Sequence, residues 1–76
     1  MLLFMVKIGN FRLYCKNNEE YNIALNVVKK YIKNSHHFTE CKDFGTITIH
    51  DIKTYDEWGK IVNEINQQTI ELKHGK

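Results

Sequence analysis

The stretch that decides the fold is MVKIGNFRLY, residues 5–14. Gly9-Asn10 separates two runs in which apolar and polar residues alternate, a pattern typical of a hairpin with a two-residue turn. The turn fixes a register of five pairs: Ile8–Phe11, Val6–Leu13 and Phe4–Cys15 on an apolar face, and Lys7–Arg12 and Met5–Tyr14 on the other. Because the turn and the hydrophobic pattern agree, we expect a hairpin over residues 2–16 with one buried face.

Two amphipathic helices follow from the hydrophobic spacing, over residues 18–34 and 55–72. Asn17 and Thr54 are good N-caps, and each is followed three residues later by a glutamate in capping-box position. The buried stripes are expected to comprise Tyr21, Ala24, Leu25, Val28 and Ile32 in the first helix, and Trp58, Ile61, Val62, Ile65, Thr69 and Leu72 in the second.

A second hairpin is predicted over residues 38–52. Asp43-Phe44-Gly45 has the form of a three-residue loop with glycine in the left-handed position. This register places Thr39, Cys41, Ile47 and Ile49 toward the core, and Phe38, Glu40, Lys42, Thr46, Thr48 and His50 away from it.

The predicted order is strand-strand-helix, twice, over residues 1–76. It indicates a two-layer α+β domain, ββαββα, in which two helices pack on one face of a four-stranded, mainly antiparallel sheet. The pattern leaves the strand order open. The residues expected to be buried together are Val6, Ile8, Phe11, Leu13, Leu25, Val28, Ile47, Ile49, Trp58, Ile61 and Ile65.

Composition excludes several classes of protein. The chain has 76 residues, 42% of them hydrophobic, and a formal charge of +2. Its longest apolar run, residues 1–6, is far shorter than a membrane span, and two cysteines are too few for a disulfide scaffold. We therefore expect a cytoplasmic protein without a membrane partner. Lys, Ile and Asn make up 27 residues, and their AT-rich codons suggest a phage or mobile-element source.

Cysteine and histidine side chains are the potential metal ligands, and they are Cys15, His36, His37, Cys41, His50 and His74. Structural zinc sites usually contain closely spaced ligand pairs, which this chain lacks. Both cysteines are expected on the core face, where a thiol behaves as a small hydrophobe. We expect neither a metal nor a cofactor.

The stretch Ser35-His36-His37-Phe38, followed by residues 43–49, resembles a segment of the HicA-type toxin family. Members of that family are small ribonucleases with a catalytic histidine in a Gly-Ser-His segment before a hairpin. The resemblance implies that His36 is the general base. The alternative, which we favour, is that His36 and His37 are polar residues in a connection between a helix and a strand.

Two binding surfaces can be predicted. Lys7, Arg12, Lys16 and Tyr14 would form a basic outer face of the first hairpin, and Lys29 and Lys33 would add charge from the first helix, as in a nucleic-acid-binding module. Exposed Tyr14, Phe44, Phe38 and Met5 would instead favour a protein partner. An unprotected edge strand would also permit a homodimer.

No complete catalytic set can be assembled from this sequence. We therefore expect a small non-enzymatic protein that binds a protein partner, such as a phage inhibitor of a host nuclease or an anti-CRISPR protein. The alternatives are a nucleic-acid-binding module and a HicA-like ribonuclease.

Overall fold

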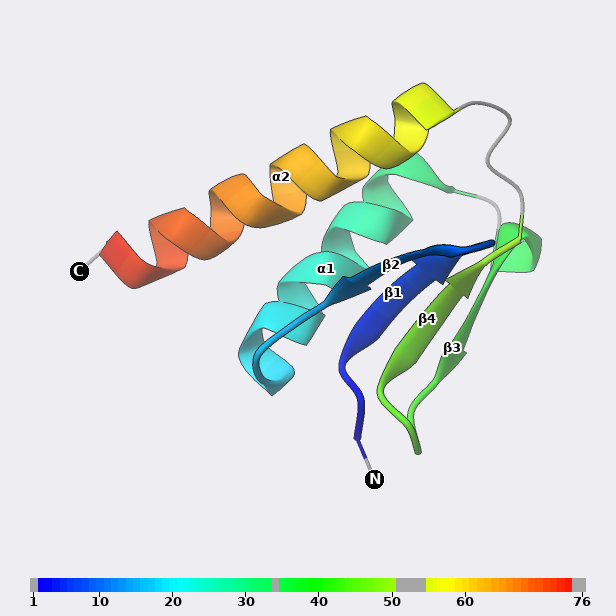
Figure 1. The fold of residues 1–76 in the computed structure, drawn as a ribbon, viewed down its shortest axis with the longest axis horizontal. Coiled ribbons are helices and arrows are strands. Elements are labelled where there is room, and N and C mark those ends of the chain that lie inside the picture. The colour runs from blue at the N-terminus through cyan, green and yellow to red at the C-terminus, as the bar shows by residue number, and fades with distance from the viewer. Residues whose placement is uncertain (1, 34, 51–54, 75–76) are drawn as a thin grey trace.

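The computed structural model describes residues 2–33, 35–50 and 55–74. Its elements are β1 (Met5–Ile8), β2 (Phe11–Tyr14), α1 (Asn18–Tyr31), the 3-10 helix η1 (Ser35–His37), β3 (Phe38–Cys41), β4 (Thr46–Ile49) and α2 (Tyr55–His74). This confirms the α+β class and the ββαββα order. Figure 1 shows the sheet as one layer and both helices as the other, with α2 lying along α1 and reaching past the sheet.

The sheet has the strand order β2-β1-β4-β3. The two hairpins are antiparallel, whereas β1 and β4 pair in parallel in the centre. The sheet is therefore mixed, and the prediction of a mainly antiparallel sheet is wrong. The reason is that α1 carries the chain from one edge of the sheet to the other, so that β4 returns beside β1 in the same direction.

The first hairpin has the predicted register, with Lys7 opposite Arg12 and Val6 opposite Leu13. Gly9 adopts a φ of +53°, which a glycine accepts without steric cost. The prediction that Phe11 is buried is wrong, because 49% of it is exposed. It lies in an edge strand, where α2 covers it only in part, and its ring centroid is 6.5 Å from that of Trp58.

The second hairpin has a different register from the predicted one. Cys41 pairs with Thr46, so the loop contains the four residues 42–45 instead of three. One additional loop residue turns every β3 side chain to the opposite face. Phe38 therefore packs against the core, and the prediction that it is exposed is wrong, as is the core position of Thr39 and Cys41.

Helix α1 begins as predicted. The side chain of Asn17 accepts a hydrogen bond from the backbone N–H of Glu20 at 2.9 Å. The Glu20 carboxylate, itself buried, accepts the N–H of Lys16 at 3.2 Å, one residue before the cap. The helix ends at Tyr31, short of residue 34, and Ile32 has extended backbone geometry. Thr54 and residues 34, 51 and 52 of the predicted elements lie outside the described residues.

The core lies between the sheet and the two helices. Its buried members are Val6, Tyr21, Ala24, Val27, Val28, Ile32, Ile47, Ile49, Ile61 and Ile65. The predicted core residues Ile8, Leu13, Leu25 and Trp58 are only partly buried against this cluster. Val27 was not predicted, because the helical stripe is wider than a single row of side chains. No helix within the described residues is long and apolar enough to cross a membrane.

Candidate functional site

Three exposed large hydrophobic residues lie on two neighbouring segments at one end of the sheet, and we call this region the apolar end. Phe44, in the β3–β4 loop, is 55% exposed, and Leu2 and Leu3 are 54% and 44% exposed. The segment before β1 runs beside the loop, because Leu3 donates its N–H to the Phe44 carbonyl at 2.6 Å and Met5 donates to Gly45 at 2.9 Å. Figure 1 shows the start of the chain beside this loop.

Two residues at the apolar end have left-handed backbone conformations. Gly45 has a φ of +65° and Phe4, which is not a glycine, has a φ of +51°. A left-handed conformation costs a residue with a side chain about 1–2 kcal/mol, so the surrounding contacts must hold Phe4 there. One is ring packing, with the centroids of Phe4 and Tyr21 5.8 Å apart. Another is the hydrogen bond from the Cys15 N–H to the Phe4 carbonyl at 2.6 Å.

A pocket of about 250 Å³ lies next to the apolar end, and it is lined by Leu2, Phe4, Asn18, Tyr21, Asn22, Glu40, Lys42 and Gly45. The Tyr21 hydroxyl donates to the carbonyl of Thr46 at 3.3 Å and lies 3.5 Å from a Glu40 carboxylate oxygen. Burial, followed by the negative charge of Glu40, raises the pKa of Tyr21 to about 12. The phenol is therefore neutral at physiological pH and acts as a hydrogen-bond donor.

Both cysteines are unpaired thiols. Burial, together with the nearby Glu20 carboxylate, raises the pKa of Cys15 to about 11. A thiol must ionise to act as a nucleophile or a metal ligand, so Cys15 is unsuited to either role at neutral pH.

The sheet face opposite the helices, which we call the open face, carries eight strand positions in two rows. From β2 to β3, one row is Tyr14, Met5, Thr46 and Cys41, and the other is Arg12, Lys7, Thr48 and Thr39. The predicted neighbours Lys7, Arg12 and Tyr14 therefore share one surface. Tyr14 is 61% exposed, whereas Met5 is only 9% exposed, so the prediction that Met5 is exposed is wrong.

The remaining predicted basic residues lie elsewhere. Lys16 follows β2, beyond the end of the strand, and is exposed. Lys29 and Lys33 lie in and just after the last turn of α1, in the helical layer. The predicted basic surface is thus divided between two layers of the molecule.

His36, His37 and His50 lie toward the end of the sheet opposite the apolar end, whereas His74 is the last residue of α2. His36 is exposed in η1, and His37 accepts the backbone N–H of His50 at 2.7 Å. The Nε2 atom of His50 is 2.6 Å from the Thr39 hydroxyl. Within the described residues, no three cysteine, histidine, aspartate or glutamate side chains come together in a group that could hold a metal ion.

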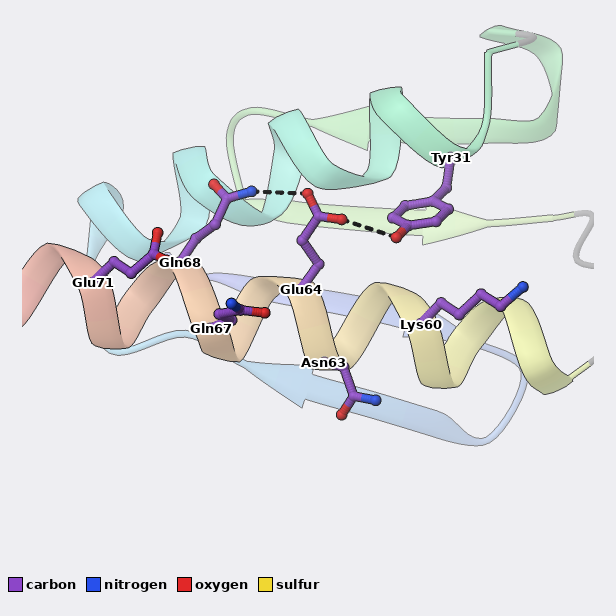
Figure 2. A pocket seen from close by; sticks show the side chains of 7 residues that line it. All are labelled: Tyr31, Lys60, Asn63, Glu64, Gln67, Gln68 and Glu71. Atoms are coloured by element: carbon purple, nitrogen blue, oxygen red, sulfur yellow. Dashed lines mark hydrogen bonds between the residues drawn. The ribbon is translucent and has the colours of Figure 1, made fainter.

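A polar groove of about 420 Å³ runs between the helices and was not predicted from the sequence. Its centre is Glu64, whose carboxylate accepts hydrogen bonds from Tyr31 at 2.8 Å and from Gln68 at 2.9 Å (Figure 2). Lys30 forms an ion pair with the same carboxylate at 2.8 Å. The hydrogen bonds from Lys30 and Tyr31 lower the pKa of Glu64. The sequence did carry a signal for this groove, because its α2 residues follow one another at helical spacing and are all polar. They are Lys60, Asn63, Glu64, Gln67, Gln68 and Glu71.

The candidate partner-binding residues thus separate into groups. Phe44 lies at the apolar end, Tyr14 and Met5 lie in the row of the open face nearest to it, and Phe38 is partly buried against the core. Leu2 and Leu3 were missed, because they precede the paired strands and follow no alternating pattern. Comparison with protein-family models, curated proteins and solved structures found no match to this chain.

Proposed function

We propose that this chain is a non-enzymatic binding protein whose partner is another protein, docked on the apolar end. The observation that supports this most strongly is the exposure of Leu2, Leu3 and Phe44, at 54%, 44% and 55%, on two segments whose backbones are hydrogen-bonded to each other. Contiguous apolar patches on small proteins mark interaction sites, whereas scattered exposed hydrophobic residues do not.

The geometry of the apolar end also favours binding. Backbone hydrogen bonds from Leu3 and from Met5, at the start of β1, join its loop to the rest of the sheet, so Phe44 is presented on an ordered backbone. Little conformational entropy is then lost on association. The adjacent pocket is lined by the Glu40 carboxylate, a hydrogen-bond acceptor, which would give a docked segment polar as well as apolar contacts.

The identity of the partner stays a prediction. A host nuclease is the partner class that agrees with a phage source, which the Lys-, Ile- and Asn-rich composition suggests. A homodimer formed through an edge strand, β2 or β3, would leave the apolar end available and is a separate prediction.

The proposal is tested by capturing the partner and then measuring its affinity for two variants, Phe44→Ala and Ile70→Ala. Ile70 is a matched control because it is 57% exposed but lies in the last turns of α2. We expect Phe44→Ala to weaken binding by roughly 30-fold or more, the effect of an aromatic hot spot, and Ile70→Ala to leave it unchanged. A purified protein partner that binds wild type and Phe44→Ala equally would refute the proposed surface. Circular dichroism verifies that both variants fold.

A further inference from the structure

The open face has a charge pattern that its own fold does not require. Its eight strand positions include two bases, three threonines and an exposed tyrosine, but no carboxylate. Glu40 is the acidic residue of the described strands, and the strand alternation turns it to the helix-covered face, where it lies 3.5 Å from the Tyr21 hydroxyl. The strand positions of the open face therefore carry positive charge and no negative charge, and the uncharged positions beside Met5 and Cys41 are threonines and a tyrosine.

The two bases of this face stand directly opposite each other. Lys7 of β1 pairs with Arg12 of β2. Like charges in directly opposite positions destabilise an antiparallel pair. Within the described residues, neither side chain forms an ion pair that would offset this repulsion. A bound anion would neutralise both charges at once.

The other side chains of the face fit a nucleic acid. Tyr14, 61% exposed, lies in the adjacent row on the same strand as Arg12 and presents a ring on which a base can stack. Thr48 and Thr39 continue the row of Lys7, and the His50 ring lies at the end of that row, 2.6 Å from Thr39. Hydroxyl and imidazole groups donate hydrogen bonds to phosphate or sugar oxygens.

We propose that the open face binds single-stranded nucleic acid, with Arg12 and Lys7 on phosphates and Tyr14 stacked on a base. Four strands make a surface roughly 14 Å wide, from three strand spacings of about 4.8 Å. Such a platform suits an extended single strand, whose bases are free to stack, and the described strands present no projecting element to enter the groove of a duplex. This surface is separate from the apolar end and does not depend on the partner proposed there.

Fluorescence anisotropy with short oligothymidine and oligouridine tests the proposal. Arg12→Glu is compared with Lys29→Glu, an exposed position on α1 with the same change in net charge. Arg12→Glu places opposite charges across the β1–β2 pair, so it should not impair folding. We expect Arg12→Glu to weaken binding by roughly tenfold or more and Lys29→Glu by less than about twofold, because Arg12 would contact phosphate and Lys29, on the helical layer, would not.

Salt dependence and stacking provide independent measurements. Loss of one phosphate contact should reduce the slope of log K against log salt by about 0.7 in Arg12→Glu. Tyr14→Ala should weaken binding roughly 5- to 150-fold, while Tyr14→Phe, which retains the ring, should not. Phe44→Ala should leave oligonucleotide binding unchanged, which separates this surface from the apolar end.

Three results would overturn the proposal. They are the absence of binding at micromolar protein and physiological salt, equal losses in Arg12→Glu and Lys29→Glu, and displacement of the oligonucleotide by polyglutamate as readily as by unlabelled oligonucleotide. The last result would assign the open face to an acidic protein segment.

Discussion

Ile61 is the residue at which the packing of α2 can be tested most directly. It is completely buried and belongs to the core cluster, together with Ile65 one turn later. Ile61→Ala removes three carbon atoms, which at ~0.8 kcal/mol each is about 2.4 kcal/mol of lost transfer free energy. The remaining cavity brings the expected cost into the range of ~2–5 kcal/mol. A chain of this length has a free energy of unfolding of roughly 4–11 kcal/mol, so the variant should lose a large share of its stability.

Urea unfolding followed by tryptophan fluorescence measures this cost. Trp58 is the single tryptophan, and it reports on the α2–sheet contact because its ring lies 6.5 Å from that of Phe11. Ile70→Ala, at a position that is 57% exposed, is the matched control and should change the free energy of unfolding by no more than ~0.5 kcal/mol. Equal costs in the two variants would show that α2 packs on the sheet through another face.

Three further predictions concern glycines, a thiol and a histidine. In thermal unfolding, Gly59→Ala should stabilise by roughly 0.5–1 kcal/mol, because its Cβ would meet no atom within 4 Å. Gly45→Ala should destabilise by about 1–2 kcal/mol, because φ is +65° and the Cβ would lie 3.1 Å from the Phe4 ring; the reverse order would contradict both. The pKa of Cys15 is raised from 9.0 to about 11, so the stability this provides is complete below pH 9.0 and is lost as the pH rises toward about 11. Cys15→Ala should lose less stability over that interval in urea titrations, and identical pH profiles would contradict this. The wild-type protein should not cleave RNA; metal-independent cleavage of messenger RNA that disappears in His36→Ala would establish the ribonuclease alternative.

The first hairpin could be predicted in detail, whereas the second could not, and the difference lies in the turns. A two-residue Gly9-Asn10 turn determines one register, and the alternating residues agree with it. In the second hairpin, Gly45 is left-handed as predicted, but that conformation suits loops of three and of four residues. The choice between them depends on whether Phe38 or Thr39 meets the helices, which is a tertiary contact.

The strand order and the apolar end also lay beyond a local pattern. Pairing of β1 with β4 is decided by the path of α1 across the sheet, and no feature of either strand encodes it. The exposure of Phe44 was predictable from its place in the loop. The adjacent exposed leucines were not, because the hydrogen bonds that bring residues 2–3 beside the loop join segments far apart in the sequence.

The central parallel pair has a consequence for the folding rate. Each hairpin closes a short loop, whereas the contact of Val6 with Ile47 joins the two halves of the chain. Closing a loop of roughly 40 residues costs about 2–3 kcal/mol more conformational entropy than closing a two-residue turn. That cost must be met before the β1–β4 contact contributes any stabilisation, so the docking of the two ββα halves sets the height of the folding barrier. This chain should accordingly fold more slowly than a helical protein of the same length, even though its helices and its two hairpins form between residues that are close in the sequence.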